Sequence, residues 1–233
     1  MVSELQIRVL FGISGAREAY RNSDIAVVID VLRAASTITT ALSNGAKSVI
    51  VVKEIDQALR LSRKYRDSIL AGERRGIKIS GFNLNNSPLE FRKSIVEGKT
   101  IIFTSSNCAP IVEELKGCPL MMLACFLNLS SAALYARRVA ERLGRNVAII
   151  HAGRYGKPSS DDMFCAEVLR ALIRGDIKSP PPTDLVKEFL KYTSAGIYLS
   201  SIGRSDDVEY CGNVDLLNVV PIWTENGFIG SSV

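Results

Sequence analysis

Short apolar runs alternate with amphipathic segments along most of the chain. The clearest run, residues 25–29 (Ile-Ala-Val-Val-Ile), has no polar position and predicts a strand buried on both faces. Similar runs predict strands at residues 5–11, 48–52, 69–71, 99–104, 120–125, 146–150 and 215–222. Helical periodicity predicts helices at residues 34–42, 54–65, 89–96, 109–115, 128–143, 161–173, 184–192 and 195–202. Because strands and helices alternate, we expect an α/β fold with a mostly parallel sheet and helices on both faces, a three-layer α/β/α arrangement.

Three segments depart from this rhythm. Residues 17–23 are predicted to be a polar connection, and residues 76–88, which have no regular period, are predicted to be a packed binding loop. The prolines at residues 180–182 break the alternation. We therefore predict an α/β core that carries the site at residues 1–178. Residues 179–233 are expected to form a smaller C-terminal α/β subdomain or an extension packed on the core, and an insertion loop at the prolines is the alternative.

Polar residues follow the central apolar run directly. Asp30 ends the predicted strand, and Arg33 precedes the predicted helix at residues 34–42. In open α/β sheets, ligands bind at the carboxyl ends of the strands, so an Asp and an Arg placed there suggest a metal and a phosphate. The alternative is an Asp that caps the helix beside a solvated Arg. Spacing alone does not decide between the two interpretations.

Other predicted strands also end in polar residues. These are Glu73 and Arg74, the stretch from Thr104 through Ser106 to Asn107, and the loop that runs from Gly153 to Asp161 and Asp162. Carboxylates suit Mg²⁺, arginines bind phosphate bidentately, and a helix N-terminus donates N–H groups to an anion. Each cluster also has a purely structural interpretation, as a surface ion pair, a helix cap or a complement to the helix dipole.

Composition narrows the class of protein. The 233 residues carry a net charge of +5, which permits an anionic ligand, but Lys and Arg are spread at helical spacings and predict no nucleic-acid partner. Five cysteines without a Cys-x-x-Cys pair argue against disulfides and zinc knuckles. His151 is the only histidine and is interpreted as structural rather than catalytic. With neither a signal segment nor a long apolar run, the chain is expected to be cytoplasmic, without membrane contact.

Several sequence signatures are absent. The chain has no Gly-x-x-x-x-Gly-Lys phosphate loop and no Gly-x-Gly-x-x-Gly fingerprint, so nucleotide binding has no support. It also has no Cys-x5-Arg signature and no Gly-x-Ser-x-Gly elbow. The remaining candidate chemistry is that of carboxylates, arginines and hydroxyl groups.

Five motifs occur in the order and spacing of one family. They are Val-Ile-Asp-Val-Leu-Arg-Ala at residues 28–34, Gly-Glu-Arg at 72–74, Gly-Phe-Asn-Leu-Asn-Asn-Ser-Pro at 81–88, Thr-Ser-Ser-Asn at 104–107 and Ser-Asp-Asp at 160–162. On these motifs the chain resembles the 2-phosphosulfolactate phosphatases from about residue 24 to 173, and more weakly near 220–221. The resemblance implies a Mg²⁺-dependent hydrolase of coenzyme M biosynthesis that acts on a small anionic phosphate ester.

The resemblance supplies positions, and side-chain chemistry suggests their roles. Asp30 and Glu73 are expected to hold Mg²⁺, with Asp161 or Asp162 as a further ligand or a base. Arg33 and Arg74 are expected to bind the phosphate. The substrate-binding residues would be Asn86, Ser87, Thr104, Ser106, Asn107 and Gly153.

The chain departs from the family pattern at five positions, one of which is Asp161, because Asp161-Asp162 stands where the family has a Glu-Asp pair. Cys108 and Ala109 stand where the family usually has Gly and Thr, and Asn83 and Asn85 stand where it usually has Asp and Gly. These departures leave two alternatives open, a non-catalytic protein that binds a small anion and a phosphatase for a different phospho-acid. The sequence does not decide the oligomeric state, and a homo-oligomer remains one possibility.

Overall fold

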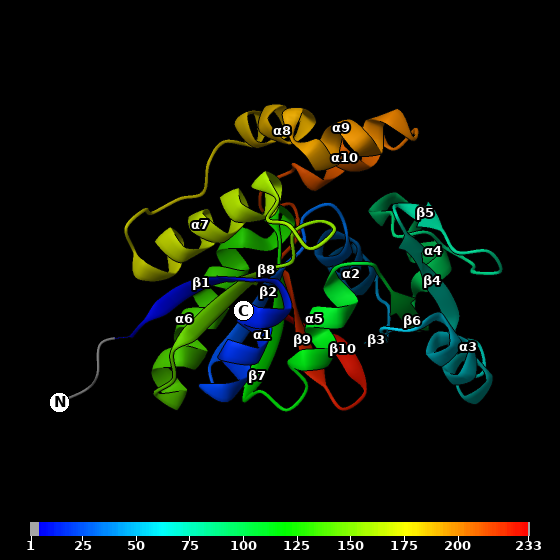
Figure 1. Cartoon of the computed structure of the whole chain (residues 1–233), viewed down its shortest axis with the longest axis horizontal. Helices are drawn as coiled ribbons and strands as arrows, with labels where there is room; N and C mark the ends of the chain where they lie inside the picture. The colour runs from blue at the N-terminus through cyan, green and yellow to red at the C-terminus, as the bar shows by residue number, and fades with distance from the viewer. Residues whose placement is uncertain (1–4, 233) are drawn as a thin grey trace.

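The computed structural model describes residues 5–232 and confirms an α/β fold with a mostly parallel sheet (Figure 1). In these residues ten strands form one sheet in the spatial order β1-β8-β2-β7-β9-β10-β3-β6-β4-β5. The strands are β1 (Ile7–Phe11), β2 (Ile25–Ile29), β3 (Ser48–Val51), β4 (Ile69–Arg74), β5 (Ile77–Lys78), β6 (Thr100–Thr104), β7 (Leu120–Ala124), β8 (Val147–His151), β9 (Val219–Thr224) and β10 (Gly227–Ser232).

Helices connect most of these strands. They are α1 (Gly12–Arg21), α2 (Ala34–Ser43), α3 (Ile55–Lys64), α4 (Lys93–Val96), α5 (Cys108–Glu114), α6 (Leu129–Leu143), α7 (Ser160–Arg174), α8 (Thr183–Tyr192), α9 (Ser194–Ser201) and α10 (Ser205–Cys211), with short 3₁₀ turns η1 (Pro88–Glu90) and η2 (Phe126–Asn128). The expected polar connection at residues 17–23 is wrong, because α1 occupies most of it. The expected helix at residues 89–96 is reduced to η1 and the single turn of α4.

The sheet consists of two parallel blocks joined by a hairpin. Strands β1, β8, β2 and β7 run parallel to one another, and so do β3, β6 and β4. Between the blocks lies the β9–β10 hairpin, which pairs antiparallel with β7 on one side and with β3 on the other. The last strands of the chain therefore hold the two blocks together.

Helices cover both faces of the sheet, as the sequence predicts. In β2, Ala26 and Val28 pack with α1, α2 and α5, whereas Ile25, Val27 and Ile29 pack with α6 and α7 on the opposite face. This split follows the two-residue period of a strand. All five side chains are fully buried, which explains the unbroken apolar run. On the second block, Ala58 of α3 packs against Ile102 of β6.

Helices α8 to α10, which we call the cap (residues 183–211), lie at the top of the molecule in Figure 1, over the carboxyl ends of the parallel strands. The prolines at residues 180–182 lie in the connection between α7 and the cap. The predicted division of the chain into units 1–178 and 179–233 stays a prediction. Residues 1–4 of the first unit and residue 233 of the second lie outside the described residues. After the cap, β9 and β10 return to the middle of the sheet.

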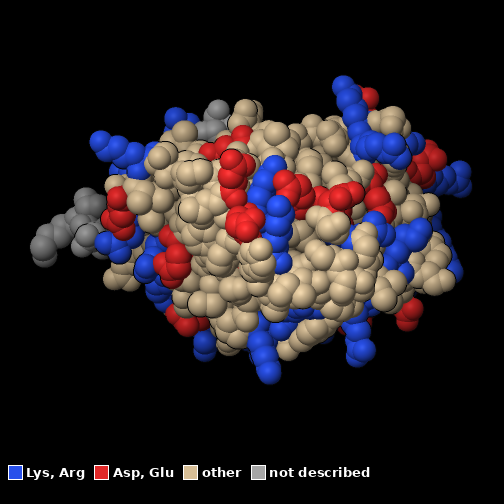
Figure 2. Space-filling model, turned by 90° about the horizontal axis from the view of Figure 1, so that it is seen from above, with Lys and Arg blue, Asp and Glu red and all other residues tan. Residues whose placement is uncertain are grey.

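The surface seen from above carries both signs of charge. Figure 2 shows basic and acidic side chains next to one another on this face. Lys187 and Lys191 of α8 form ion pairs with Glu209 of α10, at 3.1 Å and 3.2 Å. Of the helices between residues 5 and 232, none has the length and apolar character needed to cross a bilayer.

Candidate active site

The carboxyl ends of β2, β4, β6 and β8 meet at one pocket beneath the cap. The structure thus brings together polar strand ends that lie far apart in the sequence. The pocket is lined by Asp30, Leu32, Arg33, Glu73, Arg75, Gly76, Asn86, Ser106, Asn107, Arg154, Tyr155, Ala195, Tyr198 and Leu199. Its walls therefore come from the loops after β2, β4, β6 and β8, from the loop after β5 that carries Asn86, and from α9.

Three buried carboxylates, which we call the carboxylate cluster (Asp30, Asp161 and Asp162), lie close enough for their charges to interact. Asp30 lines the pocket, whereas the predicted catalytic residues Asp161 and Asp162 are not part of its lining. Asp30 Oδ1 accepts a hydrogen bond from the backbone N–H of Ala34, at 2.9 Å, so Asp30 also caps α2. Asp161 Oδ1 is buried without a hydrogen-bond partner in the described residues. Asp30 therefore caps α2, as one interpretation of the sequence has it, and also lines the pocket, while its role as a metal ligand stays a prediction.

Asp162 has a different part in the cluster. Its two oxygens accept backbone N–H groups of Val31 and Gly153, both at 2.8 Å. It thereby fastens the loop after β2 to the loop after β8. Gly153 has a left-handed backbone with φ of 66°, and a Cβ there would lie 2.3 Å from the carbonyl oxygen of Lys157, so only glycine fits.

Burial raises the pKa of every member of the carboxylate cluster. The pKa of Asp30 rises to about 7, mainly through burial and further through the charges of Glu73 and Asp161. The pKa of Asp161 rises to about 6 for the same main reason. Burial, Asp161 and Asp30 raise the pKa of Asp162. Such a cluster favours either bound protons or a nearby cation at neutral pH.

Glu73 lies at the end of β4 and also lines the pocket. Its carboxylate accepts hydrogen bonds from the backbone N–H of Gly76 at 2.6 Å, and from the N–H and hydroxyl of Ser106 at 2.7 Å and 3.1 Å. Glu73 therefore ties the β4–β5 turn to the loop after β6. Unlike Asp161, both of its oxygens already have protein partners.

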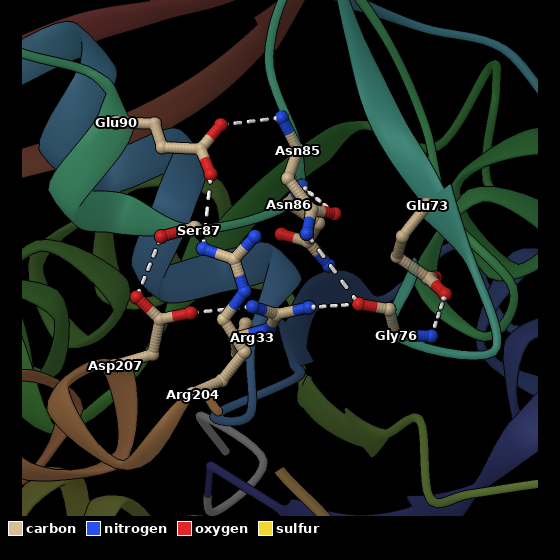
Figure 3. A network of polar contacts seen from close by, with 9 residues as sticks. All are labelled: Arg33, Glu73, Gly76, Asn85, Asn86, Ser87, Glu90, Arg204 and Asp207. Carbon is tan, nitrogen blue, oxygen red and sulfur yellow. Dashed lines mark hydrogen bonds and ion pairs between the residues drawn. The ribbon is translucent and has the colours of Figure 1, made fainter. Parts of the chain in front are cut away.

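Arg33 is held by a set of polar contacts that we call the cap network (Arg33, Glu73, Gly76, Asn85, Asn86, Ser87, Glu90, Arg204 and Asp207; Figure 3). The guanidinium forms a buried ion pair with Asp207 of α10 and donates to the carbonyl oxygen of Gly76 at 2.9 Å. The other oxygen of Asp207 accepts the Ser87 hydroxyl at 2.6 Å. Arg33 therefore lines the pocket with its charge already paired.

A second pair of contacts completes the cap network. Glu90 accepts from Arg204, at 3.0 Å, and from the backbone N–H of Asn85, at 2.7 Å. Arg204 directly precedes α10, so this ion pair and the one between Arg33 and Asp207 both join the cap to the loops of the core. The predicted binding loop at residues 76–88 is ordered by these bonds.

The structure does not bring Arg74 and Thr104 into the pocket. Arg74 donates to the carbonyl oxygens of Glu73 and Lys53, both at 2.8 Å, and to the Thr104 hydroxyl at 3.0 Å. That hydroxyl in turn donates to the carbonyl oxygen of Lys53. Together these bonds fasten β4 and β6 to the loop after β3. The predicted phosphate and substrate contacts of these two residues stay predictions without support from the geometry.

The other predicted substrate-binding residues fall into two groups. Asn86, Ser106 and Asn107 line the pocket, and the buried Oδ1 of Asn86 has no hydrogen-bond partner in residues 5–232. Ser87 lies behind the pocket wall, where it binds Asp207. Gly153 acts through its backbone N–H on Asp162.

Cys108 and Ala109, which depart from the family pattern, belong to the hydrophobic core rather than to the pocket wall. Both are buried in the first turn of α5. Burial raises the pKa of the Cys108 thiol, so this cysteine is not an activated nucleophile. The departure therefore leaves the lining of the pocket unchanged.

Four functional candidates were missed by the sequence analysis: Arg75, Arg154, Tyr198 and Asp207. Arg75 and Arg154 line the pocket from two loops, and Tyr198 lines it from α9. One signal was available, because successive residues of a strand point to opposite sides and Glu73 and Arg74 were therefore poor candidates to share one pocket. Nothing local in the sequence marks Asp207, which lies 174 residues from Arg33.

The site fits a hard divalent cation better than a soft one. Within residues 5–232, no three or more His, Cys, Asp or Glu side chains are grouped so that together they could hold a metal ion. Mg²⁺ does not require one, because it commonly binds one or two carboxylates and keeps its waters or substrate oxygens. Asp30 at the pocket and the unpartnered Oδ1 atoms of Asp161 and Asn86 are donors of the kind that Mg²⁺ prefers.

Fold and site together define an α/β protein with a pocket for a small anionic ligand at the carboxyl edge of its sheet. The chain belongs to the 2-phosphosulpholactate phosphatase family, whose model matches residues 14–226. The family resemblance predicted from the sequence motifs is thereby confirmed, and the chain is a member of a family of phosphoric monoester hydrolases.

Relatives named "Probable 2-phosphosulfolactate phosphatase" match most of the chain. The protein from Clostridium acetobutylicum is 34% identical, over 97% of this chain and 100% of its own length. Those from Caldanaerobacter subterraneus and Thermotoga maritima are each 37% identical over 88% of this chain, and over 90% and 91% of their own lengths.

Proposed function

We propose that the protein is a Mg²⁺-dependent phosphatase that hydrolyses 2-phosphosulfolactate to sulfolactate and phosphate, a reaction of the coenzyme M biosynthesis type. The observation that carries the proposal is the pocket in which Asp30, a buried carboxylate of raised pKa, lies among the lining arginines Arg33, Arg75 and Arg154. The family and the names of the relatives support the choice of substrate. A cytoplasmic location and the absence of a nucleic-acid partner stay predictions.

Asp30 is the proposed principal metal ligand, and Asp161 is the proposed second one or the base. Asp161 is preferred over Asp162 because Asp162 already accepts two backbone N–H groups. A bound Mg²⁺ would neutralise charge on the transferred phosphoryl group. Glu73 stays a candidate ligand, although its hydrogen bonds to Gly76 and Ser106 indicate mainly a positioning role.

The remaining steps belong to the chain's own side chains. Arg33, held at a fixed place by Asp207 and Gly76, would donate its remaining N–H groups to the phosphate. Asn86 and Ser106 line the same pocket and would orient the ester. Asp161, whose pKa is about 6, would accept a proton from the attacking water near neutral pH.

The test is phosphate release by the purified protein from 2-phosphosulfolactate, with Mg²⁺ and with excess EDTA. We expect turnover that EDTA abolishes and added Mg²⁺ restores. Turnover that persists in EDTA would contradict the metal requirement. A parallel series of small phospho-acids tests whether 2-phosphosulfolactate is the preferred substrate. Preference for another ester would contradict the proposed substrate.

The alternative of a non-catalytic anion-binding protein rests on Cys108 and Ala109. Because both residues are buried in the core and do not line the pocket, the structure gives this alternative no specific support. Binding of sulfolactate without any turnover on the phospho-acid series would nevertheless favour it.

A further inference from the structure

Two arginines of the pocket, Arg75 and Arg154, form no ion pair with an acidic side chain in the part of the chain that the structure describes. Both line the same pocket as Asp30. Arg33, the third arginine of the lining, has its charge paired with Asp207. Arg75 and Arg154 therefore supply the uncompensated positive charge of the pocket.

Arg154 is held in a defined orientation. Its guanidinium stacks on the ring of Tyr198, with 4.0 Å to the ring centroid, and on Tyr155, at 4.8 Å. One N–H group donates to the carbonyl oxygen of Ser194 at 3.0 Å. A guanidinium stacked on aromatic rings keeps N–H groups at its edge free for an anion.

Tyr198 also contacts the second arginine. Its hydroxyl donates to the backbone carbonyl oxygen of Arg75 at 2.8 Å, while the backbone N–H of Arg75 donates to the Ser106 hydroxyl at 3.2 Å. Arg75 has a left-handed backbone, with φ of 54°, so these bonds hold a turn that is otherwise unfavourable. One side chain of the cap thus contacts the guanidinium of Arg154 and the backbone of Arg75.

The proposed substrate carries more negative charge than the rest of the pocket balances. Besides the phosphate, 2-phosphosulfolactate has a sulfonate and a carboxylate, both ionised at neutral pH. Asp30 and Asp161 repel these groups, and Arg33 is already paired. Arg154 lies close enough to Asp161 for its charge to oppose the rise in the pKa of that carboxyl group. An anion bound to Arg154 therefore lies next to the carboxylate cluster.

We propose that Arg75 and Arg154 bind the acid groups that the substrate carries besides its phosphate, and that Tyr198 is the positioning residue for both. The inference rests on the proposed function and names the part of the pocket that selects a polyanionic ester. It also assigns a role to the cap, because α9 supplies Tyr198 and the carbonyl group of Ser194.

The test compares two substrates, 2-phosphosulfolactate and isopropyl phosphate, which carries neither acid group. For Arg154→Gln and Arg75→Gln we expect the ratio of kcat/KM for the first substrate over the second to fall about 10- to 100-fold, the range for loss of a charged hydrogen bond. The change should lie mainly in KM for 2-phosphosulfolactate. Arg137→Gln, on the exposed face of α6, is the matched control and should leave the ratio unchanged.

Tyr198 is tested by two replacements. Tyr198→Phe keeps the ring under Arg154 and loses only the hydrogen bond to Arg75, so it should lower the ratio less than Tyr198→Leu, which removes both contacts and should lower it several-fold. Equal losses on both substrates in the arginine variants would place these side chains on the phosphate and overturn the inference. An unchanged ratio would overturn it as well.

A binding measurement separates this inference from the proposed function. Calorimetric titration with sulfolactate requires no turnover, and we expect wild-type protein to bind it and Arg154→Gln to bind it at least about tenfold more weakly. Loss of binding in the variant supports the inference even if no hydrolysis is found. Equal binding by wild type and variant overturns the inference while leaving the phosphatase intact.

Discussion

Arg33 of the cap network and Asp30 of the carboxylate cluster line the same pocket, but the two regions differ in how far their charged groups are paired. In the cap network, Asp207 binds both Arg33 and Ser87. In the carboxylate cluster, Asp161 keeps a buried oxygen without a partner in the described residues, and the pKa of Asp30 rises to about 7. The buried charges of Arg33 and Asp207 in the first region are paired, whereas Asp30 and Asp161 in the second region have no cationic partner that forms an ion pair with them in the described residues.

This difference distinguishes buried charges that stabilise the fold from buried charges that are available for function. A buried charge is tolerated when an opposite charge and further hydrogen bonds satisfy it, as they do for Arg33. A buried carboxylate without such partners destabilises the fold unless a proton or a cation joins it. We infer that the cap network holds the pocket together and that the carboxylate cluster performs the chemistry.

The largest expected effect is a loss of stability, and it tests the cap network. Asp207→Ala leaves the buried charge of Arg33 unpaired and should lower the free energy of unfolding by about 3–5 kcal/mol. Urea denaturation followed by circular dichroism measures this change. Asp206→Ala, at the exposed neighbouring position of α10, is the matched control and should change stability little. A loss for Asp207→Ala no larger than that of the control would show that the ion pair does not hold the cap.

The next effect is a loss of activity, and it tests the carboxylate cluster. Asp30→Asn should reduce kcat about 10²- to 10³-fold, since the neutral amide no longer supports the charge of the reaction centre. The protein should remain folded, because the amide oxygen can still accept the N–H of Ala34. Phosphate release measures kcat, and urea denaturation of the same preparation measures the stability of the variant. An unchanged rate would remove Asp30 from the reaction.

Much of the fold was predictable because the strands are buried on both faces. The apolar run of β2 defines its strand without tertiary information, and every residue in it is buried. By contrast, β10 (Gly227–Ser232) is rich in Gly and Ser and becomes a strand only by pairing with β9 and β3. Helix α1 was missed since its buried residues are small, namely Gly15, Ala16 and Ala19.

The site was predictable only where the strand ends themselves carry it. Asp30 and Glu73 follow apolar runs and were found, and both line the pocket. Arg154 lies in a loop and Tyr198 on the cap, so that only the folded chain shows that they share a pocket with Asp30. Sequence proximity also paired Glu73 with Arg74, whose side chain the structure places outside the pocket.

A smaller effect distinguishes Glu73 from the carboxylate cluster. Glu73→Gln replaces one acceptor oxygen by an NH₂ group that faces the donors of Gly76 and Ser106. Loss of a buried hydrogen bond should lower the free energy of unfolding by about 1–3 kcal/mol. Asp30→Asn should show no such loss in the same urea experiment. If Glu73→Gln instead keeps its stability and loses as much activity as Asp30→Asn, Glu73 belongs with the carboxylate cluster as a metal ligand.

The smallest expected effect is a pH dependence of stability in the metal-free protein. The pKa of Asp30, about 7, lies above its ordinary value of 3.8. The folded state therefore binds a proton more tightly than the unfolded state does. The stabilisation is complete below pH 3.8 and is lost as the pH rises through about 7. Because the amide introduced by Asp30→Asn cannot ionise, the melting temperature of this variant minus that of wild type should increase from about pH 5 to about pH 8.

Differential scanning fluorimetry in EDTA measures this difference, and Asp206→Asn serves as the exposed control with a constant offset. Added Mg²⁺ should raise the melting temperature of wild type more at about pH 8 than at about pH 5, because the metal and the proton compete for the same carboxylate. It should raise that of Asp30→Asn less at either pH. If the difference in melting temperature between Asp30→Asn and wild type stays constant with pH, Asp30 is already paired in the folded protein. The contrast between an unpaired Asp30 and the paired charges of the cap network would then be wrong.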